Sequence, residues 1–131
     1  MASGLTTAER NRFLDARFAT LDVYGALFTA DPGDAGAVTD QVANSNAYAR
    51  TELTCLTAAA GSISNTAALE FPVASGGAWG TITHFGIATT ATYADTTLIA
   101  SGELDASKTI ADGDQIKFAI GNITIAIAAQ A

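Results

Sequence analysis

The chain has few of the residues that most enzyme and metal sites require. It contains one cysteine, Cys55, and one histidine, His84, among its 131 residues. A single cysteine excludes an intramolecular disulfide, and one cysteine with one histidine excludes a conventional zinc site. The sequence also has no nucleophile elbow, phosphate loop or dinucleotide fingerprint. We therefore predict that the protein is not an enzyme, with no catalytic residue, no metal site and no cofactor.

Positive charge is scarce as well. Six Lys and Arg residues stand against thirteen Asp and Glu residues, which gives a formal net charge of −7. This balance opposes attraction to nucleic acid or to an anionic membrane, so we expect neither as a partner. No apolar run approaches the length needed to cross a bilayer.

Charged residues of both signs are unusually few. They make up 15% of the chain, while 49% of the residues are hydrophobic and Ala, Thr and Gly are abundant. Ordinary soluble domains carry about 25% charged residues. A neutral surface of small residues is typical of a protein that is partly covered by other subunits. Composition therefore indicates a component of an assembly.

One helix is predicted near the N-terminus. Thr6 and Glu9 have the spacing of a capping box, which predicts that a helix starts there and runs over about residues 7–18. We place its apolar face by the three-to-four spacing of four side chains, Phe13, Leu14, Phe18 and Leu21. Arg10, Asn11, Arg12, Asp15 and Arg17 are assigned to its solvated side.

The rest of the chain is predicted to be short strands. Alternating apolar residues indicate strands at 21–28, 48–56, 69–73, 79–87, 98–104, 108–110, 115–120 and 123–127. Turns are expected at 31–34, 105–107 and 111–114, and residues 35–47 are expected to form an exposed loop. Gly121-Asn122 is expected to join the last two strands as a hairpin. Small residues beside Phe85 and Ile87 suggest close backbone approach.

The fold class follows from this pattern. Seven to eight short strands at this spacing, without crossover helices, predict a mainly β fold, an antiparallel β-sandwich or Greek-key barrel with one N-terminal amphipathic helix. We expect an N-terminal helical arm at residues 1–20 and a single β-sandwich domain at 21–131.

Several residues have both a structural and a functional interpretation. His84 is expected to pack, since it has no partner for catalysis. Asp31, Asp34, Asp40, Asp112 and Asp114 are expected to form turns, with a loop calcium site as the alternative. Arg50 is expected to form a surface ion pair with Glu52 or a loop aspartate. Trp79 is expected in the core, and the alternative is that Trp79, Tyr48, Tyr24 and Tyr93 stack on sugars.

A set of segments spread over nearly the whole chain is similar to small virion proteins of tailed bacteriophages. The most specific is Trp79-Gly80-Thr81-Ile82-Thr83-His84-Phe85-Gly86-Ile87. The others are Leu5-Thr6-Thr7-Ala8, residues 26–36 around Asp31-Pro32-Gly33, Tyr48-Ala49-Arg50, Phe71-Pro72, Gly102, Ser107-Lys108-Thr109 and Gly113-Asp114. Members of this family carry labels of head decoration or cement protein and of tail-fibre-like protein. The resemblance implies a virion part and supplies no catalytic residue.

Composition and resemblance together lead to a functional expectation. We expect a capsid decoration or cement protein on the capsid surface that binds across neighbouring capsid subunits and stabilises the shell. Its partners would be the major capsid protein or other virion proteins, and it would form a homo-oligomer, for which a trimer fits a local threefold. Arg10, Arg12 and Arg17 are the expected contact residues. The alternative is a tail-associated fibre or host-recognition module that binds through residues 31–46 and 88–96.

Overall fold

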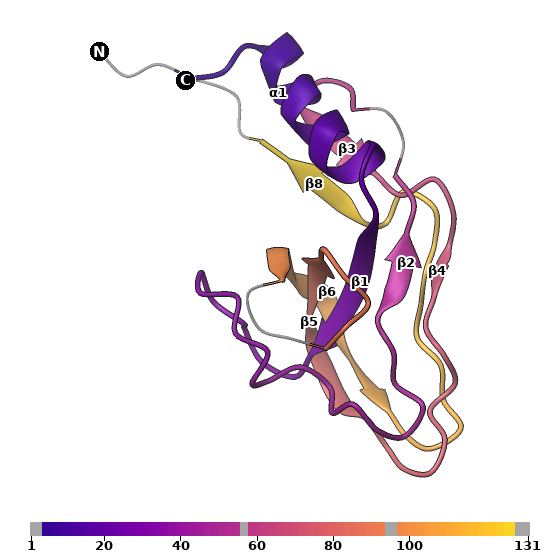
Figure 1. Ribbon diagram of the computed structural model, residues 1–131. Coiled ribbons are helices and arrows are strands. Elements are labelled where there is room, and N and C mark those ends of the chain that lie inside the picture. The colour runs from indigo at the N-terminus through magenta and orange to yellow at the C-terminus, as the bar shows by residue number, and fades with distance from the viewer. Residues whose placement is uncertain (1–3, 56–57, 94–96, 128–131) are drawn as a thin grey trace. The chain divides into compact units, whose positions relative to one another are not determined.

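The computed structural model of the protein describes residues 4–55, 58–93 and 97–127 and is mainly β (Figure 1). One helical segment near the N-terminus precedes eight strands in these described ranges. The elements are α1 Thr7–Leu14, the π-helical turn η1 Asp15–Ala19, β1 Val23–Phe28, β2 Thr51–Leu53, β3 Ser62–Ser64, β4 Leu69–Glu70, β5 Gly80–Ala88, β6 Leu98–Ile110, β7 Lys117–Phe118 and β8 Thr124–Ala126. The mainly β class, the antiparallel pairing and the N-terminal helix are confirmed. None of the helical residues described here forms a segment long and apolar enough to cross a membrane.

The chain divides into two compact units. Unit 1 is built from Met1–Asp22, Leu53–Leu69 and Phe118–Ala131, as far as these stretches are described, and unit 2 from Val23–Glu52 and Glu70–Lys117. Unit 1 therefore draws on the beginning, middle and end of the chain. The expected partition into an arm at 1–20 and one sandwich domain at 21–131 stays a prediction.

The helix of unit 1 begins where its capping residues predict. The Thr6 hydroxyl accepts a hydrogen bond from the Glu9 backbone N–H at 3.3 Å. At the other end, α1 passes directly into η1, whose wider turn breaks the 3.6-residue spacing after Leu14. Leu14 is buried and packs with Ala58 and Ile63.

The apolar face assigned to this helix was partly wrong. Phe13 is 54% exposed and Leu21 is 55% exposed, whereas Arg10 is buried. The buried side also carries polar groups, because the Asn11 carboxamide accepts the Gly61 N–H at 2.8 Å and the Asp15 carboxylate accepts the Ala58 N–H at 2.5 Å. The helix is thus held by hydrogen bonds to a neighbouring loop as well as by apolar contact.

The predicted hairpin at Gly121-Asn122 was also wrong. β8 pairs antiparallel with β3, and β7 pairs with β4, so the two strands expected to pair with one another have different partners. The fully buried Asn65 side chain makes hydrogen bonds to the backbone of this region in place of those expected between the two strands of the hairpin. It accepts the Ile123 N–H at 3.0 Å and donates to the carbonyls of Ala67 at 2.8 Å and Ala119 at 3.0 Å.

A four-stranded sheet with the order β2-β1-β5-β6 dominates unit 2. β1 is almost wholly buried and pairs antiparallel with β5, with Gly25 opposite Ile87 and Leu27 opposite Phe85. The close approach expected beside Phe85 is present at Gly86. A Cβ there would lie 2.5 Å from Leu98 Cδ1 and 2.7 Å from Phe28 Cε2, so only glycine fits.

β6 is one strand of 13 residues, not two strands separated by a turn at 105–107. Its register on β5 jumps at the predicted turn. Ile82 pairs with Lys108 and His84 with Glu103, so residues 104–107 lie opposite the single residue Thr83. The polar Asp105-Ala106-Ser107 sequence therefore makes a bulge in a continuing strand.

The segment before β2 differs from the expected strand at 48–56. Only Thr51–Leu53 is strand, and Tyr48 and Arg50, which lie in the expected strand but outside the observed one, are both buried. Gln41 and Val42, expected in an exposed loop, are buried as well. The predicted turns at 31–34 and 111–114 are present, with Gly33 and Gly113 at positive φ. Leu56 and residues 94–96 lie outside the described residues.

Candidate functional site

The three arginines expected to contact a partner do not share one exposed patch. Arg10 lies inside unit 1, where Nη1 donates to the Ile127 carbonyl at 3.0 Å and Nη2 to the Thr7 hydroxyl at 2.9 Å. Gly61 makes room for it, since a Cβ at that position would overlap the guanidinium. Arg10 therefore links α1 by a hydrogen bond to the chain that follows β8, and its guanidinium is buried within unit 1.

The other two arginines are more accessible. Arg12 is exposed and forms an ion pair with Glu9 at 2.8 Å, and Arg17 is half-buried in η1. The exposed apolar side chain Phe13 belongs to the same helical segment, and the exposed Leu21 lies two residues beyond its end. We name Arg12, Phe13, Arg17 and Leu21 the helix surface. The expectation that these arginines bind a partner stays a prediction.

The most elaborate polar arrangement of the described chain surrounds Arg50 in unit 2. Its Nη1 donates to the carbonyls of Thr90 at 3.2 Å and Thr92 at 2.8 Å and to the Thr97 hydroxyl at 2.8 Å. Its Nη2 donates to the Gln41 Oε1 at 2.9 Å. The expected position of Arg50 at the surface was wrong, because the side chain is buried, and the partners described here are neutral oxygens.

Tyr48 and Tyr93 extend this network. The Tyr48 hydroxyl accepts hydrogen bonds from the Leu27 N–H at 3.0 Å and the Gln41 Nε2 at 2.8 Å. The Tyr93 hydroxyl donates to the Gln41 carbonyl at 3.1 Å, and the Tyr93 ring lies 5.8 Å from the Arg50 guanidinium carbon. We name Gln41, Tyr48, Arg50, Tyr93 and Thr97 the Arg50 network.

Burial shapes the acid–base properties of this network. Desolvation raises the pKa of the Tyr48 phenol above its ordinary value, and the hydrogen bonds from Leu27 and Gln41 oppose it. Desolvation lowers the pKa of Arg50, although a guanidinium stays charged at neutral pH. The network holds a buried positive charge with fixed donors, which suits positioning of a loop.

The Arg50 network connects the two loops expected to recognise a host. Gln41 belongs to the loop at 31–46, and Thr90, Thr92 and Tyr93 belong to the loop at 88–96. Sequence reasoning named both loops but missed Gln41 and Thr97 as the residues that join them. Nothing in the spacing of residues around Arg50 showed which oxygens it would meet.

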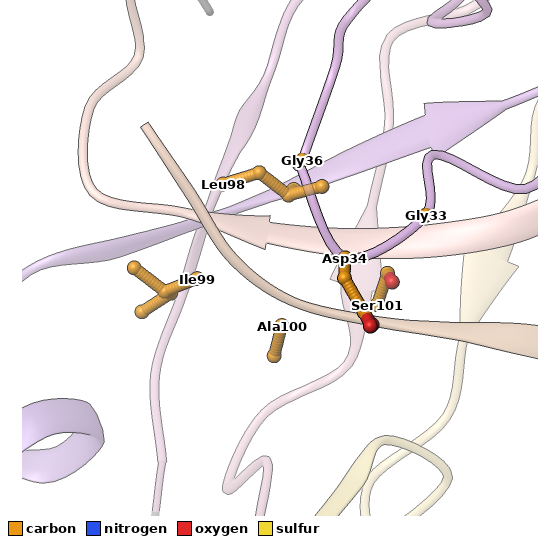
Figure 2. A pocket seen from close by; sticks show the side chains of 7 residues that line it. All are labelled: Gly33, Asp34, Gly36, Leu98, Ile99, Ala100 and Ser101. Carbon is orange, nitrogen blue, oxygen red and sulfur yellow. The ribbon is translucent and has the colours of Figure 1, made fainter. Parts of the chain in front are cut away.

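A small hollow lies beside this region, between the turn at Gly33–Gly36 and the start of β6 (Figure 2). It has a volume of about 250 Å³ and is lined by Gly33, Asp34, Gly36 and residues 98–101. In Figure 2 the Leu98 side chain extends toward Gly36, and a Cβ at Gly36 would lie 3.3 Å from the Leu98 Cβ. The polar side chains that line the hollow are those of Asp34 and Ser101.

Two of the aspartates interpreted as turn formers accept a hydrogen bond within their own turn. Asp31 accepts the Gly33 N–H at 2.9 Å, and Asp114 accepts the Ala111 N–H at 3.0 Å. Asp112 instead accepts the N–H of Gly76, 36 residues earlier in the chain, at 3.1 Å. Among the described residues, no group of three His, Cys, Asp or Glu side chains could hold a metal ion. The alternative of a loop calcium site stays untested.

His84 and Trp79 have structural surroundings. His84 is half-buried on β5, and its Nδ1 lies 2.9 Å from the Thr83 hydroxyl. Trp79 is buried, as expected, with its ring edge-on to Tyr48 at 5.3 Å and its Nε1 donating to the Asn46 carbonyl at 2.9 Å. Cys55 is half-buried beside the Leu14 cluster, and burial raises the pKa of its thiol.

The comparison with protein families gives the identity that this geometry alone does not. A comparison with curated proteins gave no match. The family described as podophage GP4 fiber I protein gp80 matches residues 6–126, which is nearly the whole chain. This match agrees with the resemblance of Trp79–Ile87 and the other segments to phage virion proteins. The chain therefore belongs to the family of the podophage GP4 fiber I protein gp80, a family of structural phage virion proteins.

Proposed function

We propose that this protein is a non-enzymatic, fibre-type component of the phage virion that recognises a partner through the loops of unit 2. The family description, which names a fibre protein, supports a role in contact and assembly. The partner of these loops would be a glycan or protein on the host surface. Catalysis has no part in this role.

The observation that carries the proposal is the junction of the two loops. Tyr93 donates to the Gln41 carbonyl, and Arg50 contacts both Gln41 and the carbonyls of Thr90 and Thr92. Loops that bind partners are most effective when a rigid scaffold presents them, since less conformational entropy is lost on binding. The Arg50 network supplies that support. Ala91 and Thr92, which are exposed, lie at the surface of the supported loop.

Capsid decoration is the second candidate, and the helix surface favours it. Phe13 and Leu21 are large apolar side chains left exposed on unit 1, next to the arginines Arg12 and Arg17. Exposed apolar groups with arginine are enriched at protein interfaces. In this role the helix surface would bind the major capsid protein across a joint between neighbouring subunits. Arg10 would act through the helix position only, because its guanidinium is internal.

Binding of the purified chain to two targets distinguishes these candidates. We would measure binding to host cells and to purified shells that lack this protein, for the unmodified chain and for two variants. Ala91→Arg alters the supported loop, and Phe13→Ser alters the helix surface. Each variant is the control for the other.

The fibre proposal predicts binding to host cells that Ala91→Arg abolishes and Phe13→Ser leaves unchanged. The decoration candidate predicts binding to shells with the opposite response to the two variants. Host-cell binding that is unaffected by Ala91→Arg would contradict the assignment of the loop.

A further inference from the structure

Arg17 is the one arginine among the described residues whose side chain has no hydrogen-bond or ion-pair partner there. Arg10 and Arg50 donate to interior oxygens, and Arg12 pairs with Glu9. Arg17 lies half-buried in η1, and no described residue accepts a hydrogen bond from its guanidinium. Arginine is enriched among the residues that dominate binding energy at protein interfaces. An unpartnered guanidinium on a helical segment is therefore a candidate contact group.

Large apolar side chains accompany Arg17 at intervals of four residues. Phe13 lies four residues before it and Leu21 four residues after it, and both are more than half exposed. Residues four apart in a helix are neighbours on one side of it, which places Phe13 beside Arg17. A cation at an interface needs a carboxylate, and exposed apolar atoms need apolar cover. The helix surface therefore fits a partner that offers a carboxylate beside an apolar side chain.

The hollow in unit 2 offers both groups (Figure 2). It is lined by Gly33, Asp34, Gly36 and residues 98–101, and we name it the Asp34 hollow. The Asp34 carboxylate has no hydrogen bond or ion pair with any described residue, and Ile99 is an apolar lining side chain that is 37% exposed. The volume of about 250 Å³ lies below the roughly 300–1,000 Å³ of sites that hold small molecules, so the hollow suits a single side chain.

The charge of the chain is divided unevenly along the sequence. The first 22 residues carry three acidic and three basic residues, so the net charge of −7 belongs to residues 23–131. The segment that contains Asp34 has no Lys or Arg from residue 23 to residue 49. Electrostatic complementarity therefore favours contact between the helix surface of one copy and the Asp34 hollow of another.

The signs of the two charges decide how copies can meet. Two helix surfaces in contact would bring Arg17 against Arg17, and two hollows would bring Asp34 against Asp34. Juxtaposed like charges oppose association, whereas a guanidinium and a carboxylate form paired, charge-assisted hydrogen bonds. One chain thus carries both halves of a complementary contact, and each half lacks a partner among the described residues. This selects a second copy as the occupant.

We propose that copies of this chain associate head to tail, with the helix surface of one copy docked on the Asp34 hollow of the next. The Arg17 guanidinium enters the hollow and donates to the Asp34 carboxylate, and Phe13 packs against Ile99. Each pair leaves one helix surface and one hollow unoccupied, so the contact repeats from copy to copy or closes into a ring. This self-association goes beyond host recognition, since neither surface includes Ala91.

Sedimentation velocity on the full chain, over a series of concentrations, tests the proposal. We would compare the unmodified chain with Arg17→Ala, which removes the cation, and with Asp34→Lys, which sets a second cation opposite Arg17. The dissociation constant for self-association should rise by about tenfold or more in each variant, since each loses the central ion pair.

An equimolar mixture of the two variants tests whether the contact joins two different surfaces. Arg17→Ala retains an intact hollow, and Asp34→Lys retains an intact helix surface, so one normal contact can form between them. The other two surfaces of such a pair are both altered, so growth stops at two copies. We expect pairs in the mixture at concentrations at which each variant alone is monomeric.

Two variants serve as matched controls for the change in net charge. Lys117→Ala, at an exposed lysine on β7, changes it by the same amount as Arg17→Ala. Asp105→Lys, at an exposed aspartate on β6, changes it by the same amount as Asp34→Lys. Both should leave the dissociation constant unchanged. Far-UV circular dichroism of each variant checks that the fold is retained.

Three results would overturn the proposal. The first is a chain that stays monomeric at about 100 μM, which would leave the helix surface to a different protein such as the major capsid protein. The second is an oligomer that Arg17→Ala and Asp34→Lys affect no more than their controls do. The third is a mixture of the two variants that associates no better than either variant alone, because the two surfaces would then not bind one another.

Discussion

Two of the six basic residues, Arg10 and Arg50, are buried and bind backbone carbonyls. A guanidinium carries five N–H donors in a fixed plane. One arginine side chain can therefore donate hydrogen bonds to backbone carbonyls of several chain segments. Arg10 donates to the Ile127 carbonyl in the chain after β8, and Arg50 donates to the Thr90 carbonyl in the loop before β6. The sequence shows the arginines but not the carbonyls, which are brought together only by the fold. For this reason both residues were assigned to the surface.

Replacing Arg50 by Leu should destabilise unit 2 by about 2–3 kcal/mol, because the carbonyls of Thr90 and Thr92 and the Gln41 side chain lose their donor. The shift of the urea midpoint measures this effect. Arg50→Lys should recover only part of it, since an ammonium cannot reach all of these oxygens. The control Arg12→Leu, at an exposed ion pair, should change the midpoint little. Equal midpoints for Arg50→Leu and the unmodified chain would contradict the anchoring role.

The raised pKa of Tyr48 makes stability fall at alkaline pH. A folded-state pKa above the unfolded value means that the stabilising contribution is complete below the ordinary value of 10.0 and is lost as pH rises through the folded pKa. Tyrosinate absorbance should show a step, from Tyr48, that occurs at higher pH in the folded chain than in urea. Tyr48→Phe should remove this late step. A late step that persists in Tyr48→Phe would assign it to another tyrosine.

At the scale of elements, local signals predicted where segments begin and turn, and long-range contacts decided what they pair with. The Thr6 cap, β1 and the turns at 31–34 and 111–114 depend on neighbours within a few residues, and these predictions were correct. The hairpin predicted at Gly121-Asn122 does not form. The Asn65 side chain, more than fifty residues earlier, binds the Ile123 N–H and the Ala119 carbonyl instead. No local pattern reports such a partner.

Asn65 should be essential for the pairing of β3 with β8. Asn65→Ala leaves the Ile123 N–H and the carbonyls of Ala67 and Ala119 without their partner in the interior, and should destabilise unit 1 by about 2–4 kcal/mol. Amide hydrogen exchange of residues 62–64 and 124–126 should accelerate in this variant. Asn44→Ala, at an exposed asparagine, is the control and should leave exchange unchanged. Unchanged protection in Asn65→Ala would show that the strands pair without it.

At the scale of the whole molecule, composition and resemblance predicted the class of protein better than its surfaces. Few charges, one histidine and one cysteine indicated an assembly component, and the family match agrees. The candidate site was predicted only in part. The loops at 31–46 and 88–96 could be named from their turn residues, but their junction through Gln41, Arg50 and Tyr93 requires the fold. The exposed face of the helix was misplaced for the same reason.

The central claim is that this protein is a fibre-type part of the phage particle, and its position on that particle tests the claim most directly. Intact phage would be labelled with gold-conjugated antibody against the chain and imaged by electron microscopy, with the position and number of labels recorded for each particle. The account predicts label on the tail or on fibres that project from the particle. Label spread evenly over the head would contradict the fibre role in favour of capsid decoration, and particles without label would contradict a virion role altogether.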